Sequence, residues 1–364
     1  MHAALIADKR WLDDELGMFQ SLVVGLLDEQ ARVAQVVPED LPEDQASAFG
    51  ERLNYRDSDW MPARWLRLYR LRHALIECEV DLLHALDGRL WTPVASLALR
   101  MDRPAVFTLN DETDLSRVRR IRRRMGSLSH AFTASTEPLA NAIRQQIGDE
   151  VTLIPHGLRL STSADESETS PAEDTTFCAT ISGAGHPDED FRSMLVALQR
   201  IASGRHREAR FFIDSRNVDS KRIWDLIGHY NLREQVSLIP RRLGDRKLLL
   251  ESDAIIHPQA LGRSRSVLLE AMGAGKPVVA RRDPWLDCLV DDQTAWCIDG
   301  PDPDAWERAI RRLIDQPDAT RRLGDSARAW VKEHHLLSTS VARTLRVYQN
   351  VTGASLPFPE TAGA

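Results

Sequence analysis

The stretch from residue 251 to residue 280, ESDAIIHPQALGRSRSVLLEAMGAGKPVVA, carries the residues best suited to binding an anionic substrate. An apolar run at 254–256 stops at a His-Pro pair, a polar loop follows, and a helical run at 267–272 is closed by glycines. A helix that begins after such a loop offers free backbone N–H groups and the positive end of its dipole. The residues that precede and begin this helix are Gly262, Arg263, Ser264, Arg265 and Ser266. The pattern predicts a phosphate or pyrophosphate site.

The second half of this stretch resembles a family signature. The residues LLEAMGAGKPVVA, at 268–280, are similar to the motif E-x7-E-A-M-A-x-G-x-P-V-V-A of the family 4 (group 1) glycosyltransferases, which have the GT-B fold. The resemblance implies that Glu270, on the second glutamate of the motif, hydrogen-bonds the ribose hydroxyls of a nucleotide-sugar. It also implies that the backbone just before Glu270 holds the diphosphate. The alternative is an ordinary Rossmann-like helix that exposes a glutamate.

Length and composition agree with a two-domain architecture. The chain has 364 residues, 43% of them hydrophobic, and at about 150 residues per domain this is enough for two α/β cores. The resemblance implies the GT-B arrangement, an α/β fold with two Rossmann-like domains facing an interdomain cleft. The expected parts are an N-terminal acceptor domain at 1–160, an acidic Ser/Thr-rich linker at 161–176, a nucleotide-sugar donor domain at 177–337, a crossover helix at 338–352 and a disordered tail at 353–364.

Charge and apolar runs restrict the possible partners and location. The net charge of −7, from 47 Lys and Arg against 54 Asp and Glu, disfavours nucleic acid as a partner. No run reaches the roughly 18 apolar residues that span a bilayer, and the N-terminus lacks a signal-peptide core, so we expect a cytoplasmic protein. Cys78, Cys178, Cys288 and Cys297 have no metal-binding spacing and are expected to be buried, reduced thiols. No D-x-D pair follows a strand, so neither a metal nor a resident cofactor is expected.

The first half of the chain alternates strands and helices. Strands are expected at 3–7, 33–37, 80–86, 105–109, 131–134 and 151–154, and helices at 16–27, 63–79, 92–100, 116–126 and 138–147. The family has a glycine-rich loop after its first strand, which approaches the acceptor or the phosphates. Here the corresponding loop, DKRWLDDELG, contains only Gly17. The acidic, proline-punctuated segment 38–62 is predicted to be a loop.

The ligand-facing residues of this half are expected at the ends of its strands. In the family a histidine often stands at the position of Asn110, near the sugar being transferred, which makes Asn110 and Asp111 the candidate catalytic residues. The turn PHGL, at 155–158, resembles the family's P-N-G-V turn, with His156 in place of the commoner asparagine. Gly17, His84 and His156 are acceptor-side candidates, and the other interpretation of His156 is an ordinary turn residue.

The segment SRVRRIRRRMG, at 116–126, has six arginines in eight residues. Three apolar residues interleave at helical spacing, so one face of the helix is expected to pack. Dense like charge is typical of a solvated helix face. The alternative is an anionic partner, such as a lipid headgroup or a phosphorylated or lipid-linked acceptor, that contacts Arg117, Arg120 and Arg124. That alternative would place the protein peripherally on a membrane.

The donor domain departs from the family pattern at ligand-facing positions. After the strand at 177–181 the family has a loop G-R-x-x-x-E-K-G whose arginine and lysine reach the donor phosphates. In the sequence SGAGHPDED, Gly183 is retained, but Ala184 and Glu189 stand at the arginine and lysine positions. Gly262 replaces the first glutamate of the signature. Each charge-assisted contact of this kind contributes about 1.5–3 kcal/mol.

Three arginines are candidates for the missing positive charge. Arg263 and Arg265 follow Gly262 directly, and Arg241 lies in the loop 240–243 at the end of another predicted strand. One hypothesis is that Arg263 and Arg265 supply the charge lost at the earlier loop. The other is that they are surface residues of a decayed site.

The function implied by the resemblance is retaining, metal-independent transfer of a sugar from a nucleotide-sugar donor to an unknown acceptor. Two alternatives remain open at this point. The chain could be a catalytically divergent GT-B protein that binds a nucleotide or a partner without sugar transfer. It could also be another enzyme of this fold, such as a nucleotide-sugar epimerase, which would require more acidic residues and a histidine in the cleft.

Overall fold

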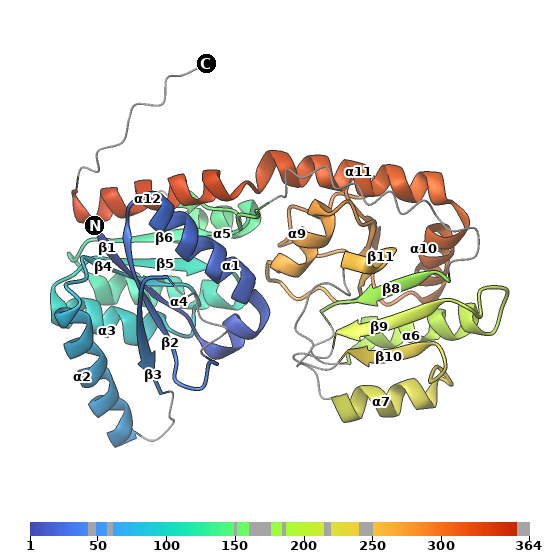
Figure 1. The fold of residues 1–364 in the computed structure, drawn as a ribbon, viewed down its shortest axis with the longest axis horizontal. Coiled ribbons are helices and arrows are strands. Elements are labelled where there is room, and N and C mark those ends of the chain that lie inside the picture. The colour runs from blue at the N-terminus through green and yellow to red at the C-terminus, as the bar shows by residue number, and fades with distance from the viewer. Residues whose placement is uncertain are drawn as a thin grey trace, which may run out of the picture. The chain divides into compact units, whose positions relative to one another are not determined.

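The computed structural model describes residues 1–42, 49–56, 61–148, 151–159, 176–183, 187–214, 220–239 and 250–354, with the backbone alone at 61–68. The chain divides into two compact units, Met1–Gly157 together with Leu337–Ala364, and Leu158–Leu336 (Figure 1). Each unit has a parallel sheet flanked by helices, which confirms the predicted α/β class. The predicted linker and tail lie almost entirely outside the described residues.

The first unit is built on a seven-stranded parallel sheet in the order β3-β2-β1-β4-β5-β6-β7. Its strands are β1 His2–Ile6, β2 Arg32–Pro38, β3 Glu51–Tyr55, β4 Leu82–Ala85, β5 Ala105–Leu109, β6 His130–Ala134 and β7 Thr152–Leu153. Its helices are α1 Lys9–Asp28, α2 Met61–Glu77, α3 Trp91–Met101, α4 Leu115–Met125, α5 Glu137–Ile147 and α12 Leu337–Thr352, with a 3₁₀ turn at Glu112–Asp114. Helix α1 packs against α12, and α2 to α5 pack in sequence against one another.

The second unit has a six-stranded parallel sheet in the order β10-β9-β8-β11-β12-β13. Its strands are β8 Cys178–Ile181, β9 Arg210–Asp214, β10 Val236–Ile239, β11 Ala254–His257, β12 Val278–Arg281 and β13 Trp296–Ile298. Its helices are α6 Glu189–Ala202, α7 Ser220–His229, α9 Ser266–Gly273, α10 Pro303–Asp315 and α11 Pro317–His334.

Both sheets reverse their strand order once, between β1 and β4 in the first unit and between β8 and β11 in the second. The pairs at these points are in register, with Ala4 opposite Leu83 and Ile255 opposite Thr180. Loops that leave the C-terminal ends of such a strand pair run in opposite directions and leave room for a ligand. Both reversal points are therefore candidate binding sites.

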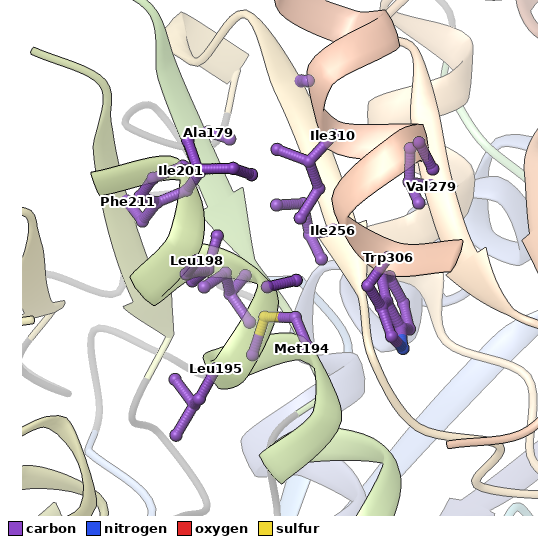
Figure 2. Packing of buried hydrophobic residues seen from close by; sticks show 14 of the residues in the cluster. Ala179, Met194, Leu195, Leu198, Ile201, Phe211, Ile256, Val279, Trp306 and Ile310 are labelled. Atoms are coloured by element: carbon purple, nitrogen blue, oxygen red, sulfur yellow. The ribbon is translucent and has the colours of Figure 1, made fainter. Parts of the chain in front are cut away.

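The core of the second unit follows from the alternation of side chains along buried strands. On β11, Ala254 and Ile256 pack into one hydrophobic cluster with α6 and α10, whereas Ile255 packs into another with α9 and α11. Figure 2 shows the first cluster, in which side chains of α6 and α10, such as Leu198 and Trp306, meet those of the strands. Successive residues of a strand point to opposite faces, so a continuous apolar run is needed where helices cover both.

Helix α12 completes the first unit, although it follows the second unit in sequence. Its residues Val341, Leu345 and Tyr348 are buried in the cluster that contains β1, β2 and α1. The chain leaves and re-enters this unit at adjacent points, because the N–H of Leu158 donates to the carbonyl of His335 over 2.8 Å. The first unit is thus formed by two segments that are distant in sequence.

Two predictions about the first unit are wrong. The segment 8–17, predicted to be a loop, is helical from Lys9 onward, because α1 begins there. The carboxylate of Asp8 caps the helix by accepting from the N–H of Trp11, and Trp11 and Leu12 are buried. The segment 38–62 contains a strand, β3, which pairs with β2. Because its side chains lie at the sheet edge and are at most half-buried, β3 lacks the apolar alternation that marks a strand.

All four cysteines are free thiols, but only Cys288 is buried, so the expectation of burial is wrong for the other three. Cys78 follows α2, Cys178 begins β8 and Cys297 lies in the edge strand β13, and all three are partly accessible, because apolar neighbours in sequence do not guarantee burial in the fold. Within the described ranges, no helix combines the length and the apolar character required to cross a membrane.

Candidate functional site

The candidate donor side is the C-terminal edge of the second sheet, where β8 and β11 lie next to each other. β8 continues into Ser182, whose backbone N–H donates to the carbonyl of Ile256 over 2.9 Å. The hydroxyl of Ser182 lies 3.2 Å from Nδ1 of His257, the last residue of β11. The two strand ends are therefore joined by hydrogen bonds at the reversal point.

Gly183 packs directly against the ring of His257. Its φ is +85°, in the region that favours glycine, and a Cβ here would lie 2.5 Å from Cε1 of His257. The ring is fully buried, and its Nε2 has no hydrogen-bond partner among the described residues. Burial, together with the nearby charges of Arg265 and Arg263, lowers the pKa of His257 to about 3. A neutral imidazole thus supports the turn at Gly183.

The loop that connects β11 to α9 contains the predicted phosphate-binding residues. Gly262 has a φ of +63°, which a residue with a side chain rarely adopts. Arg265 is the N-cap of α9, with an extended backbone and no side-chain capping hydrogen bond. Ser264, Arg265 and Ser266 are buried, and Arg263 is half-buried. Two arginines therefore directly precede the first turn of a helix, where backbone N–H groups of the first residues generally lack a partner within the helix.

Glu270 lies one turn further along α9. Seven of the eight residues of this helix are buried, and Glu270 is the exception, with a half-exposed side chain. A helix N-terminus and two arginines suit a phosphate group, and a carboxylate one turn away suits hydroxyl groups. In combination, these groups fit a ribose that carries a diphosphate.

Asp283, which the sequence analysis missed, fixes the position of Gly262. Its buried carboxylate accepts the N–H of Gly262 over 2.8 Å with one oxygen and the N–H of Trp285 over 3.0 Å with the other. Asp283 follows β12, so the contact joins the loops after two neighbouring strands. Because these residues are 21 positions apart, no local pattern indicates the contact.

Two further carboxylates connect α6 to the loops of this edge. Asp188 caps α6 by accepting the N–H of Phe191 and also accepts from Nε2 of Gln259, both over 2.9 Å. Asp190 accepts from Nε of Arg281 over 3.0 Å. Glu189, which occupies the position of the family's lysine, is exposed in the first turn of α6. Ala184 and Arg241 lie outside the described residues, so the structure does not place them.

The candidate acceptor side is a cavity of about 50 Å³ within the first unit. Its walls come from α1, the ends of β4, β5 and β6, the turn at 155–157 and the start of α12. Three predicted site residues, His84, Asn110 and His156, lie together in its wall, although they come from separate parts of the sequence. Hydroxyl groups of Thr108 and Ser340 are also part of the lining.

Asn110 and His156 are joined by a buried hydrogen bond, with 3.1 Å between Oδ1 of Asn110 and Nε2 of His156. The amide nitrogen of Asn110 donates to the carbonyl of Leu86 over 2.7 Å. Burial lowers the pKa of His156 to about 4, so its imidazole is neutral at pH 7. The cavity wall therefore contains a neutral imidazole whose orientation is set by an amide.

His84 is the centre of a second buried network. Its Nδ1 lies 2.6 Å from the hydroxyl of Tyr348 on α12, and its Nε2 lies 2.7 Å from Oγ1 of Thr108, which is 2.8 Å from Oγ1 of Thr133. Burial lowers the pKa of His84 to about 3 and raises that of Tyr348. Both ring nitrogens bond to protein groups, so the geometry assigns His84 to the attachment of α12 rather than to an acceptor.

Two predicted residues do not line the cavity. Asp111 follows β5, but its carboxylate accepts the N–H of Thr113 over 2.8 Å and caps the 3₁₀ turn. Gly17 lies inside α1 rather than in a loop, next to Met18, which does line the cavity. Asp111 caps a turn and Gly17 lies within a helix. Neither residue contributes a group to the cavity wall.

Asp114, the residue that precedes α4, is a buried carboxylate that was not predicted from the sequence. Burial and the neighbouring Asp87 raise its pKa to about 7, although it forms an ion pair with Arg117. Gly88 packs so closely that a Cβ there would lie 1.9 Å from Oδ1 of Asp114. Arg117, one of the arginines proposed to contact an anionic partner, is thus half-buried and paired with Asp114.

The other arginines of α4 divide into two groups. Arg119 and Arg122 donate to the last carbonyl groups of α5, and Arg124 donates to Oγ of Ser96 over 2.8 Å. All five of these arginines are exposed, and Arg119, Arg122 and Arg124 use their guanidinium groups in the contacts just described. The basic face of α4 that is available to a partner therefore centres on Arg120 and Arg123.

Comparison with known families agrees with this architecture. The family model "Glycosyl transferases group 1" matches residues 164–330, and "Glycosyltransferase Family 4" matches residues 20–162. The chain belongs to the group 1, family 4-like glycosyltransferases, and its two Rossmann-like units have the GT-B fold.

Individual relatives are more distant. The chain is 30% identical over 135 residues to D-inositol 3-phosphate glycosyltransferase of Salinispora tropica, a match that covers 36% of this chain and 27% of that protein. The match thus spans about a quarter of the relative's length. Among solved structures, Anabaena Alr3699/HepE in complex with UDP and glucose has a TM-score of 0.76 at 15% identity, covering 96% of this chain and all of that chain. A glycosyltransferase from Rickettsia africae has a TM-score of 0.76 at 14% identity, covering 97% and 99% of the two chains.

Proposed function

We propose that this protein transfers a sugar from a nucleotide-sugar donor to an acceptor, with retention of the anomeric configuration and without a metal ion or resident cofactor. The observation that carries the proposal is the arrangement at α9, where Arg263 and Arg265 directly precede the helix N-terminus and Glu270 is the single half-exposed residue of the helix. Family membership supports the reaction class.

In this proposal the donor diphosphate lies at the N-terminus of α9. The first-turn N–H groups and the guanidinium groups of Arg263 and Arg265 stabilise its charge, and they stabilise it further as the leaving group departs. Glu270 accepts hydrogen bonds from the ribose hydroxyls. The nearby carboxylates of Asp188 and Asp190 already accept hydrogen bonds from Gln259 and Arg281, which reduces their repulsion of the diphosphate.

The acceptor in this proposal binds to the first unit, at the cavity lined by Asn110 and His156. The relative from Salinispora tropica is described as a D-inositol 3-phosphate glycosyltransferase, so its acceptor carries a phosphate. An anionic acceptor also agrees with the exposed Arg120 and Arg123 on α4 of the same unit. Small phosphorylated polyols are therefore the first acceptors to test.

The donor assignment is tested by binding of UDP, GDP and ADP, measured by calorimetry and by thermal shift. UDP is the first choice because HepE was solved with UDP. Losing one charge-assisted contact of about 1.5–3 kcal/mol predicts that Arg263→Ala and Arg265→Ala weaken binding by roughly 10- to 100-fold. Arg308→Ala, on a side chain that is 70% exposed on α10, is the matched control and should leave binding unchanged.

Turnover is measured separately. Hydrolysis of UDP-glucose and transfer to a phosphorylated polyol are followed by NMR, which also reports the anomeric configuration, in the presence and absence of EDTA. Unchanged nucleotide affinity in both arginine variants would contradict the donor site. Tight binding with no turnover of any donor would instead assign the chain to non-catalytic nucleotide binding.

A further inference from the structure

The start of α5 offers hydrogen-bonding groups that its own cap leaves unused. Thr136 is the N-cap of this helix and has an extended backbone, but its side chain forms no capping hydrogen bond. An N-cap hydroxyl usually accepts the N–H of the second or third helical residue. The second residue here is Pro138, which has no N–H. The remaining first-turn donors, on Glu137 and Leu139, are of the kind that generally lack a partner within the helix.

Two adjacent buried hydroxyls at this point have no hydrogen-bond partner among the described residues. They are Oγ of Ser135 and Oγ1 of Thr136, although only 1% and 3% of these residues are exposed. A buried hydroxyl without a partner destabilises the folded chain, because it has lost its hydrogen bonds to water. Most buried polar side-chain atoms are paired, so two neighbouring exceptions indicate a partner from outside the chain.

The sheet places Ser135 beside the cavity of the first unit. Its N–H donates to the carbonyl of Leu109 over 3.0 Å, so the pairing of β6 with β5 continues one residue beyond the strand. On the other side, the N–H of Ile154 donates to the carbonyl of Ala134. Ser135 therefore lies in one row with Asn110 and Ile154, which both line the cavity. Neighbours in such a row point to the same face of a parallel sheet, so the Ser135 side chain lies on the cavity's side.

The charges around the start of α5 are compatible with a bound anion. Glu137 is the opposing charge in the first turn, and its carboxylate accepts from Nη1 of Arg144 over 2.8 Å. The carboxylate of Asp111, after β5, accepts the N–H of Thr113. A carboxylate that already accepts a hydrogen bond repels a nearby anion less. The donors and the helix dipole favour a negatively charged group with several acceptor oxygens, and a phosphate has this character.

We propose that the N-terminus of α5 binds the phosphate group of the acceptor, with the hydroxyls of Ser135 and Thr136 and the first-turn N–H groups as donors. This rests on the proposed function, because it assigns a position to the phosphate of a phosphorylated polyol that binds at the adjoining cavity. It places that phosphate on α5 rather than on the exposed Arg120 and Arg123 of α4. Both hydroxyls are covered in this structure, so a ligand reaches them only after a neighbouring group moves aside.

The binding test uses inorganic phosphate and glycerol 3-phosphate, with glycerol as the uncharged comparison, measured by calorimetry on the full chain. The titrations are made in an Arg263→Ala/Arg265→Ala background, so that the N-terminus of α9 contributes less. Ser135→Ala and Thr136→Val should each weaken the binding of both phosphates about tenfold, the loss of one hydrogen bond to a charged group. The matched control is Ser129→Ala, just before β6, which removes a hydroxyl that already donates to a backbone carbonyl and should leave the affinity unchanged.

Thermal unfolding without ligand separates a ligand site from an ordinary helix cap. Ser135→Ala and Thr136→Val should leave Tm unchanged or raise it, because neither hydroxyl has a hydrogen bond to lose. Ser129→Ala should lower Tm, because its hydroxyl has a partner. A lower Tm in Thr136→Val would show that this hydroxyl caps α5 in solution, and the proposal would be overturned.

Two binding results would also overturn the proposal. Unchanged phosphate affinity in both Ser135→Ala and Thr136→Val would assign the two hydroxyls to buried water. A loss confined to Arg120→Ala/Arg123→Ala would place the phosphate on α4. Failure of the proposed function appears separately, as UDP affinity that does not depend on the α9 arginines. Phosphate affinity that depends on Ser135 and Thr136 would still establish the anion site in that case.

Discussion

The carboxylate of Asp283 bonds to the backbone N–H of Gly262 at 2.8 Å, and this single contact joins the loop after β12 to the loop that begins α9. Gly262 has a positive φ, and glycine can adopt many backbone conformations. Without the hydrogen bond to Asp283, the direction of its N–H would not be fixed. The position of Arg263 and Arg265 therefore depends on a buried charge outside the family signature.

Asp283→Asn tests this dependence. The new amide has one acceptor oxygen for two N–H donors, so its NH₂ group would oppose the N–H of either Gly262 or Trp285. We expect about tenfold weaker UDP binding and a Tm lower by about 2–4 °C for each kcal/mol lost. Asp299→Asn, in an exposed ion pair with Arg282, is the control and should change neither. Normal UDP affinity in Asp283→Asn would show that the Gly262 loop is not part of the donor site.

Gly183→Ala tests the packing of the β8 turn on His257. The Cβ would approach Cε1 of the ring to 2.5 Å at a φ of +85°, so strain and a clash add together. Gly300→Ala separates the two effects, because Gly300 has a φ of +81° and no atom within 4 Å of its Cβ position. We expect Gly300→Ala to cost about 1–2 kcal/mol of unfolding free energy and Gly183→Ala clearly more, measured by urea unfolding. Equal losses of unfolding free energy in the two variants would mean that the ring of His257 moves aside without an energetic cost.

Stability should fall as the pH is lowered below about 6.5. His257 and His84 have folded-state pKa values of about 3, so between pH 3 and 6.5 the unfolded chain binds more protons than the folded chain. Each such group lowers the unfolding free energy by about 1.4 kcal/mol per pH unit in that window. Asp114, with a pKa raised to about 7, acts in the opposite sense: its contribution is present below its unfolded pKa and is lost as the pH rises toward 7.

His257→Asn should flatten the pH dependence of the second unit's unfolding, because the oxygen of asparagine can accept from Ser182 and the residue does not titrate. The measurement is the urea midpoint at pH 5, 6, 7 and 8. His334→Asn, at an exposed position on α11, is the control and should retain the slope. A slope that is the same in His257→Asn and the wild type would mean that His257 does not titrate with the predicted sign.

The exposed arginines of α4 give the last prediction. If the acceptor is lipid-linked, Arg120→Glu/Arg123→Glu should reduce binding to phosphatidylglycerol vesicles by at least about tenfold, because each basic residue near an anionic surface contributes about 1 kcal/mol. Arg321→Glu/Arg322→Glu makes the same charge change on exposed positions of α11. Equal effects of the two double variants would indicate that only net charge matters, and the Tm of both should stay unchanged.

Much of the architecture could be predicted because its signals are local. Apolar runs and helical spacing identified nearly every element of the first unit, and the ends of parallel strands bring together His84, Asn110 and His156. The start of α1 was missed because its capping Asp8 lies in a charged segment that resembles a loop. The strand β3 was missed because an edge strand needs little apolar surface.

The site residues that were not predicted from the sequence were missed for a different reason. His257 and Asp283 act through contacts with residues 75 and 21 positions away, and a lone buried histidine or aspartate has no sequence signature. Conversely, Asp111 occupied a position typical of a site residue but caps a turn, and the same local pattern serves both purposes. Position along a strand thus predicts which residues gather at the cavity wall, whereas it does not predict the groups that orient them.

The placement of α12 has a consequence for synthesis on the ribosome. The helix that covers β1 and supplies Tyr348 to His84 is translated only after all of the second unit. Until then the nascent first unit exposes the apolar surface that Val341 and Leu345 later cover, and the Nδ1 of His84 lacks its phenolic partner. Completion of the first unit therefore follows synthesis of the whole second unit, and messages truncated within the second unit would yield chains prone to capture by chaperones and proteases.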